Sequence, residues 1–171
     1  TTSSPFVNFN QKISFIFDGK KIFGYKGDTI ASALLRNNIN LVGRSFKYHR
    51  PRGIYTCGIE EPNALVQIIS EYSEPNTRAT VKKIYEGMEV ESQNRWPSLD
   101  HDIGSINSLF SPLFSAGFYY KTFMGPHKSF WKKIYEPIIR RAAGLGKPPK
   151  EFRALSSHLH HNVDVVIVGA G

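Results

Sequence analysis

Residues 13–25 read Ile13-Ser14-Phe15-Ile16-Phe17-Asp18-Gly19-Lys20-Lys21-Ile22-Phe23-Gly24-Tyr25, two apolar runs on either side of Asp18-Gly19. The first five residues of this stretch place apolar side chains at every second position, as in a strand that buries one face. Asp18-Gly19 separates two apolar runs and favours the left-handed backbone of a tight turn. The stretch therefore predicts a β-hairpin.

The residues that follow the hairpin predict a helix and then three strands. Gly27 predicts the end of the second strand, and Asp28-Thr29 predicts the start of a helix. Either Asp28 or Thr29 can accept hydrogen bonds from the N–H groups of the first helical turn. We expect one short helix ending near Ile39, a long irregular stretch over residues 43–63, and strands at 64–69, 79–85 and 88–91. A helix laid across a small mixed sheet in this order is the β-grasp arrangement of plant-type ferredoxins. The prediction is an α+β chain whose β-grasp domain covers residues 1–92, and that likeness of fold carries no function.

The composition of the chain changes near Arg95, where aromatic residues become frequent. Residues 93–160 are predicted to form a helical and irregular linker region. Phe130, Ile134, Ile138 and Ala142 lie four apart, which puts them on one helical face, and Pro137 should interrupt that helix. The many aromatic side chains of segment 110–135 fit ordinary packing between domains, and a substrate-lining role is the alternative.

The chain closes on an apolar run followed by glycines. Residues 164–168 read as a strand buried on both faces in a parallel sheet, and Gly169, Ala170 and Gly171 follow directly. Gly-x-Gly after such a strand is the first half of a dinucleotide-binding fingerprint, because its glycines allow a tight turn and close approach to a pyrophosphate. Residues 161–171 are therefore predicted to begin a Rossmann-type NAD/FAD-binding domain; a plain strand with a glycine turn is the alternative. The third glycine, the phosphate-facing helix and the ribose-binding acid are missing, so we expect the isolated chain to bind no NAD or flavin.

Positive charge is concentrated in residues 44–52, within a chain whose net charge is +8. This basic loop could bind an anion or dock against an acidic surface. We favour docking, because Glu60 and Glu61 lie in the same irregular stretch and can neutralise part of the charge. The other basic residues are spread along the chain and no nucleic-acid motif surrounds the loop, so no nucleic-acid partner is expected.

Cys57 is the only cysteine of the chain. A lone cysteine excludes an internal disulfide and an iron–sulfur cluster built from this chain, and we interpret Cys57 as a small buried residue. His158, His160 and His161 alternate as metal ligands can, but they read better as a polar lead-in to the last strand, so no metal site is expected. The sequence shows no leader and no membrane span, which suggests a cytoplasmic protein.

Two motifs carry a resemblance to a known family. The runs Ser45-Phe46-Lys47-Tyr48-His49-Arg50-Pro51-Arg52-Gly53 and Gly58-Ile59-Glu60-Glu61-Pro62-Asn63-Ala64-Leu65-Val66 strongly resemble the N-terminal region of the alpha subunit of heterotetrameric sarcosine oxidase. Residues 135–144 and 164–171 fit the same family in the same order, so the resemblance spans nearly the whole chain.

The resemblance implies a part of an amine-oxidising complex. In that family the complex demethylates sarcosine to glycine, reduces O2 to hydrogen peroxide and passes the one-carbon unit to tetrahydrofolate. It implies NAD at the loop that begins at Gly169, FAD on the beta subunit, and FMN near the alpha–beta interface. The implied partners are the rest of alpha and the beta, gamma and delta subunits, with an amine as substrate.

No catalytic residue is carried over, so we expect the isolated chain to be a structural and docking piece without activity. The alternatives are the N-terminal domain of a related amine or opine dehydrogenase or of a cyanide-forming glycine oxidase, whose true cluster would need more cysteines, and a non-catalytic binding module.

Overall fold

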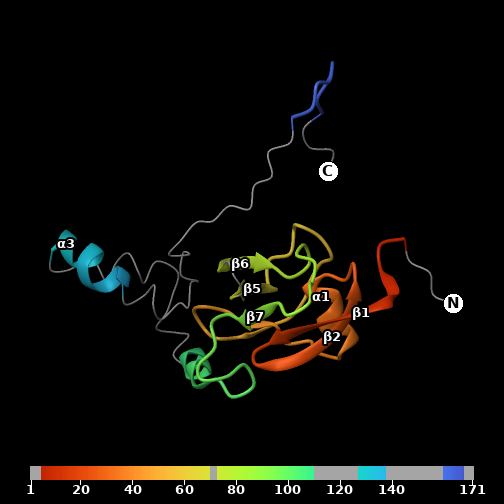
Figure 1. The fold of residues 1–171 in the computed structure, drawn as a ribbon. Coiled ribbons are helices and arrows are strands. Elements are labelled where there is room, and N and C mark those ends of the chain that lie inside the picture. Colours follow the sequence, from red (N-terminus) through yellow and green to blue (C-terminus); the bar gives the residue numbers. More distant parts are fainter. Residues whose placement is uncertain (1–4, 70–72, 110–126, 138–159, 168–171) are drawn as a thin grey trace.

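The computed structural model describes residues 5–69, 73–109, 127–137 and 160–167 (Figure 1). Its centre is a five-stranded sheet in the order β2-β1-β7-β5-β6. The strands are β1 (Asn8–Phe17), β2 (Lys20–Lys26), β5 (Leu65–Ile68), β6 (Glu74–Arg78) and β7 (Glu89–Ser92). β1 and β7 run parallel and the other neighbours run antiparallel, so the sheet is mixed, as the sequence predicted.

The predicted hairpin is confirmed. β1 and β2 pair with Phe17 opposite Lys20, and the turn residues Asp18 and Gly19 have φ angles of 48° and 77°. Positive φ at both central positions is what a two-residue hairpin turn needs. Phe15 and Ile22 face each other across the two strands and are both buried.

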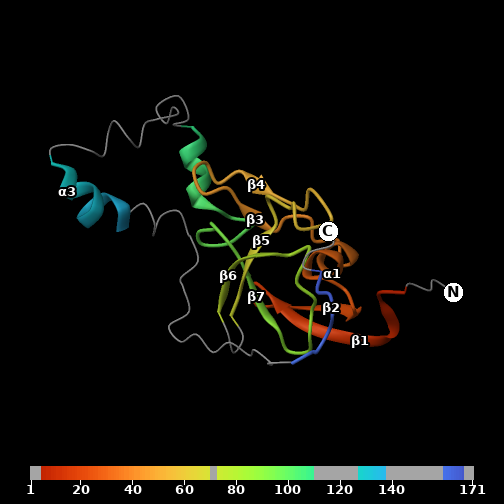
Figure 2. The same cartoon turned by 90° about the horizontal axis from the view of Figure 1, so that it is seen from above.

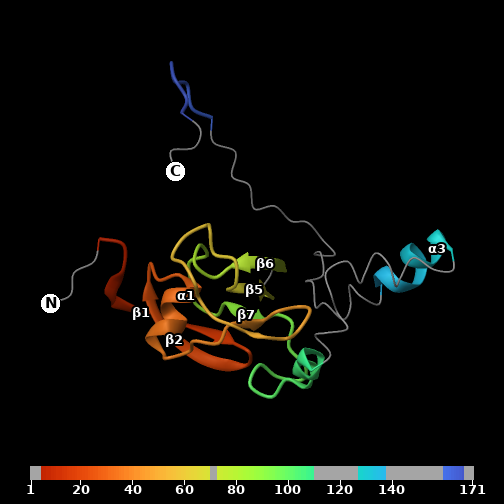
Figure 3. The same cartoon turned by 180° about the vertical axis from the view of Figure 1, so that it is seen from behind.

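The predicted helix is α1 (Ile30–Arg36), which is shorter than expected. Thr29 caps it, because its side chain accepts from the Ser32 N–H while the Ser32 hydroxyl accepts from the Thr29 N–H. The helix ends three residues before Ile39, since Asn38 takes a φ of 58°, a left-handed conformation that stops a helix. Figures 1 and 3 show α1 beside the β1–β2 hairpin from opposite sides.

The predicted strand at 79–85 is wrong, and β6 lies just before it. The Arg78 carbonyl accepts hydrogen bonds from both Val81 and Lys82, which closes a turn where the apolar pattern had suggested a strand. In this segment only Lys83 makes a β-bridge, to Thr29. The strands predicted at 64–69 and 88–91 are confirmed as β5 and β7.

The core lies between the sheet and α1. Its members are buried apolar side chains from β1, β2, α1, β5 and β7 and from the connections between them, including Phe15, Ile30, Leu34, Val66 and Met88. Burying large apolar side chains is the main term that stabilises such a small domain. The α+β class and the ferredoxin-like β-grasp arrangement are thus confirmed.

A second, two-stranded hairpin carries the basic loop. β3 (Gly43–Arg44) pairs antiparallel with β4 (Pro51–Arg52), and residues 45–50 connect them. Figure 2 shows this hairpin beside the short 3-10 helix Ile103–Ser108. Hydrogen bonds between Arg44 and Leu99 and between His49 and Asp102 join the two segments. The irregular stretch predicted at 43–63 is therefore partly ordered.

The described residues after 109 form two separate pieces. α3 (Lys128–Phe130) continues into a π-helical stretch, Trp131–Tyr135. Helical structure continues through Glu136 and Pro137, so within the described residues, and contrary to expectation, Pro137 does not interrupt the helix. Phe130 and Ile134 are 37% and 42% exposed, so the packing expected for them is not seen. Ile138, Ala142 and most of the aromatic segment lie outside the described residues.

The buried strand expected at 164–168 does not form over residues 160–167. Val165, Val166 and Ile167 are each at least 70% exposed, and no described strand pairs with them. A parallel strand exists only with hydrogen-bonded neighbours, so its apolar sequence alone does not produce one.

Candidate functional site

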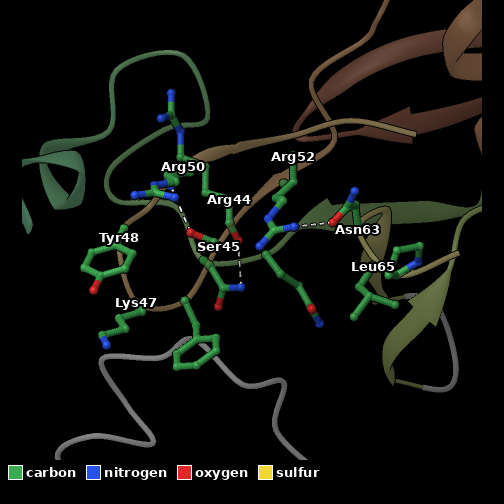
Figure 4. A pocket seen from close by; sticks show the side chains of 13 residues that line it. Arg44, Ser45, Lys47, Tyr48, Arg50, Arg52, Asn63 and Leu65 are labelled. Carbon is green, nitrogen blue, oxygen red and sulfur yellow. Dashed lines mark hydrogen bonds between the residues drawn. The ribbon is translucent and has the colours of Figure 1, made fainter. Parts of the chain in front are cut away.

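A concave basic surface of the described residues is a pocket of about 490 Å³ beside the β3–β4 hairpin (Figure 4). Four cationic residues line it, Arg44, Lys47, Arg50 and Arg52, and no carboxylate does. The hairpin supplies these four cations and four uncharged lining residues. The remaining lining residues are Pro62, Asn63 and Leu65, and Gln93 and Asn94, which follow β7. The basic loop singled out in the sequence thus forms one wall of a cavity.

Arg44 holds the β3–β4 hairpin against the segment that contains Leu99. Its guanidinium donates to the Leu99 carbonyl at 2.9 and 2.7 Å and to the His49 carbonyl at 2.9 Å. It also lies 3.6 Å from Asp102 Oδ2. A planar guanidinium suits several such acceptors at once, so Arg44 serves the structure of the pocket wall.

His49 and Asp102 form a buried pair behind this wall. Their Nδ1 and Oδ2 atoms are 2.7 Å apart, and the residues are 7% and 8% exposed. A Cβ placed on Gly104 would collide with the His49 ring, so a glycine is needed there. The sequence analysis gave His49 no role, because nothing in the sequence indicates a partner that lies 53 positions away.

Glu61 organises the loop between β4 and β5. Its Oε2 accepts from the N–H groups of Tyr55 and Thr56 at 2.8 and 2.6 Å. Its Oε1 accepts from the N–H groups of Asn63 and Ala64 at 2.8 and 3.0 Å. One buried carboxylate therefore holds both ends of a ten-residue loop, Tyr55 to Ala64, together.

These contacts also set the charge of Glu61. Burial alone raises the pKa of a carboxyl, but the backbone hydrogen bonds from Thr56, Asn63, Ala64 and Tyr55 outweigh burial and lower the pKa of Glu61 from 4.5 to about 2. Glu61 is thus an anion at neutral pH whose charge faces the backbone of its own loop. It does not neutralise the basic loop, which corrects the premise on which docking was favoured.

Cys57 is exposed, which corrects the expectation of a small buried residue. It sits on the loop held by Glu61, between a contact to Thr56 and the glycine turn at Gly58. A [2Fe–2S] cluster needs four protein ligands, at least two of them thiolates. With one cysteine in the sequence, the residues of this chain do not fit such a cluster.

The residues predicted to bind a dinucleotide are not placed by the structure. Gly169, Ala170 and Gly171 lie outside the described residues, as does His158. His160 and His161 are exposed. Within the described ranges, no three histidine, cysteine or acidic side chains gather in a way that could hold a metal ion.

A search of the helices in the described part of the chain finds none with the length and apolar character needed to cross a membrane.

Comparison with known proteins gives one family and several relatives. Residues 10–95 match the family model described as a 2Fe-2S iron-sulfur cluster binding domain. The chain is 56% identical over 171 residues to sarcosine oxidase subunit alpha of Rhizobium meliloti (strain 1021), covering 96% of this chain and 17% of the relative. It is 39% identical over 67 residues to sarcosine oxidase subunit alpha of Corynebacterium sp. (strain U-96), covering 39% of this chain and 7% of the relative.

Solved structures are also similar over part of the chain. One is L-proline dehydrogenase from P. horikoshii, with 28% identity and a TM-score of 0.38, covering 48% of this chain and 16% of that one. A score this low supports no argument. The chain spans less than a fifth of the length of the curated relatives described above.

The match over residues 10–95 covers half of the chain and agrees with the β-grasp sheet, and the relatives agree with the resemblance found in the two sequence motifs. The chain therefore belongs to the family of 2Fe-2S iron-sulfur cluster binding domains, and its resemblance to sarcosine oxidase alpha subunits is confirmed.

Proposed function

We propose that this chain is the N-terminal part of a sarcosine oxidase alpha subunit, in which its β-grasp domain serves as a docking module without a cluster. The observation that carries the proposal is 56% identity over 96% of the chain to an alpha subunit from Rhizobium meliloti. The parent complex would oxidise sarcosine to glycine, reduce O2 to hydrogen peroxide and transfer the one-carbon unit to tetrahydrofolate. It would act in the cytoplasm.

The cofactors of the parent complex follow from the same family. NAD would bind at the loop that begins with Gly169, Ala170 and Gly171, at the start of a Rossmann-type domain, while FAD would belong to the beta subunit and FMN to the alpha–beta interface. The partners would be the rest of alpha and the beta, gamma and delta subunits. Residues 1–92, 93–160 and 161–171 would be the β-grasp domain, the linker region and the start of the nucleotide-binding domain.

The docking role is supported by the loop that Glu61 holds. This loop exposes two large apolar side chains, Tyr55 at 77% and Ile59 at 75%. Large exposed side chains on a rigidly held loop are typical of an interface, because little conformational entropy is lost when they are covered. In this proposal the loop keeps its shape through a carboxylate and contacts the remainder of the alpha subunit.

The test uses the whole parent alpha subunit co-expressed with the beta, gamma and delta subunits. We expect one complex that forms hydrogen peroxide and glycine when sarcosine is added. We expect the 171-residue chain, expressed alone, to carry no more iron than a buffer blank, because its single cysteine cannot hold a cluster. A complex without sarcosine turnover would refute the assignment, and stoichiometric iron bound by the N-terminal domain would refute its cluster-free character.

Separate variants test the docking role of the loop that Glu61 holds. Tyr55→Ala with Ile59→Ser should lower the yield of assembled complex, with activity per assembled complex unchanged. Leu35→Ser is the matched control, since Leu35 is 48% exposed on α1 and is not part of this loop, and the variant should assemble normally. Equal assembly of all three proteins would exclude the loop as a docking surface.

A further inference from the structure

Two buried polar atoms beside the basic pocket lack hydrogen-bond partners within the part of the chain that the structure describes. They are Gln93 Nε2, a donor, and Asn94 Oδ1, an acceptor, and both residues line the pocket. Gln93 is only 7% exposed. Leaving a buried donor or acceptor without a partner costs about 1–3 kcal/mol, so these atoms indicate a place where a bound molecule completes the hydrogen bonding.

The same pocket carries two arginines, Arg50 and Arg52, that the described carboxylates do not neutralise. Neither Arg50 nor Arg52 forms an ion pair with a described carboxylate. Arg52 donates to Asn63 Oδ1 through one nitrogen, which leaves its other donors for a ligand. The Arg50 guanidinium lies 5.0 Å from the centre of the Tyr48 ring, a contact that favours one orientation of the side chain.

We propose that this pocket binds a small organic oxyanion, a carboxylate or a phosphate, that also carries a hydroxyl or amino group. Arg50, Arg52 and Gln93 Nε2 donate to the oxyanion, and Asn94 Oδ1 accepts from the hydroxyl or amino group. Guanidinium groups match the planar oxygens of carboxylates and the oxygens of phosphates.

The shape of the site favours a small molecule over a protein surface. A volume of about 490 Å³ lies within the range of small-molecule sites, roughly 300–1,000 Å³. The arginine side chains line a concave surface. Glu61, which was expected to neutralise the basic loop, accepts hydrogen bonds from the backbone of its own loop instead. The proposal concerns the β-grasp domain alone and does not depend on the function proposed above.

The experiment is calorimetric titration of the full 171-residue chain at low ionic strength with two matched pairs of probes. Malate and succinate differ by one hydroxyl group and test carboxylates. Glycerol 3-phosphate and propyl phosphate differ by two hydroxyl groups and test phosphates. We expect saturable one-site binding for at least one pair, with the hydroxyl-bearing member binding more tightly. Which pair binds identifies the oxyanion.

Three variants assign the residues. Arg50→Ala should weaken binding by about tenfold or more, because it removes a charged hydrogen-bond donor. Gln93→Leu should weaken binding without lowering the melting temperature, since it removes a donor that has no partner in the free protein. Lys26→Ala, which removes a charge from the exposed end of β2, is the control and should bind like the unmodified chain.

The proposal fails if none of the four probes binds saturably, or if Arg50→Ala binds as tightly as Lys26→Ala. If both members of a pair bind with equal affinity, Asn94 Oδ1 does not accept a hydrogen bond from the hydroxyl group of the ligand. A hexaglutamate peptide is the last probe: binding of this peptide without binding of any small anion would assign the pocket to protein docking instead.

Discussion

His49 Nδ1 lies 2.7 Å from Asp102 Oδ2, and this buried contact fastens the basic loop to the segment that follows the sheet. Asp102 has a second function, because its Oδ1 accepts from the Trp96 N–H at 2.7 Å. The pair thus joins three parts of the chain: the β3–β4 connection, the turn after β7 and the start of the 3-10 helix Ile103–Ser108. The pocket wall depends on a contact that lies behind it.

Replacing Asp102 by Asn should destabilise the domain by about 3 kcal/mol, because it leaves Arg44 in a largely buried position without its counter-charge. The measurement is the free energy of unfolding from urea denaturation. Asp100→Asn is the control, since Asp100 is exposed two residues away. Equal unfolding free energies for the two variants would show that the Asp102 charge does not stabilise the fold.

The Glu61 carboxylate should make stability depend on pH in acid. Its pKa is about 2 in the folded chain and 4.5 ordinarily, so the folded state favours the deprotonated form. The resulting stability is fully present above about pH 5 and is lost as the pH falls through the range from 4.5 to 2. The shift corresponds to a loss of up to about 3 kcal/mol, and unfolding in urea at a series of pH values measures it.

Substitutions at two neighbouring carboxylates, Glu61 and Glu60, test whether this pH dependence comes from Glu61. Glu61→Gln should be much less stable at pH 7, and its unfolding free energy should vary less between pH 5 and pH 2. Glu60→Gln, at an exposed neighbouring position, should keep the pH profile of the unmodified chain. A Glu61→Gln profile parallel to that of the unmodified chain would contradict the assignment.

The sequence predicted those parts of the fold that local patterns encode. The Asp18-Gly19 turn and the Thr29 cap are set by neighbours within a few residues, and both were found. The strand predicted at 79–85 failed because its apolar residues serve the core from a turn: Ile84 is buried next to Gly24 without being in a strand. Burial and strand pairing give the same pattern in so short a run.

The sequence predicted only part of the candidate site. Local density of charge revealed the basic loop, but the pocket also needs Gln93 and Asn94, which come from the end of β7. Glu61 was read as a partner of nearby arginines, whereas its four backbone donors depend on a loop conformation that no motif specifies. Long-range contacts of this kind follow from the packed chain and not from spacing.

Cys57 should react readily with a thiol reagent in the folded protein. Its residue is exposed on the loop that Glu61 holds, so access does not require unfolding. Iodoacetamide should add one carbamidomethyl group per chain, as read by intact mass, and the melting temperature should stay the same. Alkylation that occurs only in urea would place the thiol inside the fold and contradict the structure.

Gly24 should tolerate a side chain poorly, because it lies where β2 meets α1 and the turn after β6. A Cβ at this position would approach Ile84 Cδ1 to 2.6 Å and Ala33 Cβ to 3.0 Å. Gly24→Ala should therefore lower the free energy of unfolding by about 1–3 kcal/mol through overpacking. Gly43→Ala is the matched control, since Gly43 is also buried in a strand but no atom lies closer than 3.6 Å to its added Cβ. That control should stay within about 0.5 kcal/mol of the unmodified chain, and a Gly24→Ala domain of equal stability would mean that α1 does not pack against β2 as described.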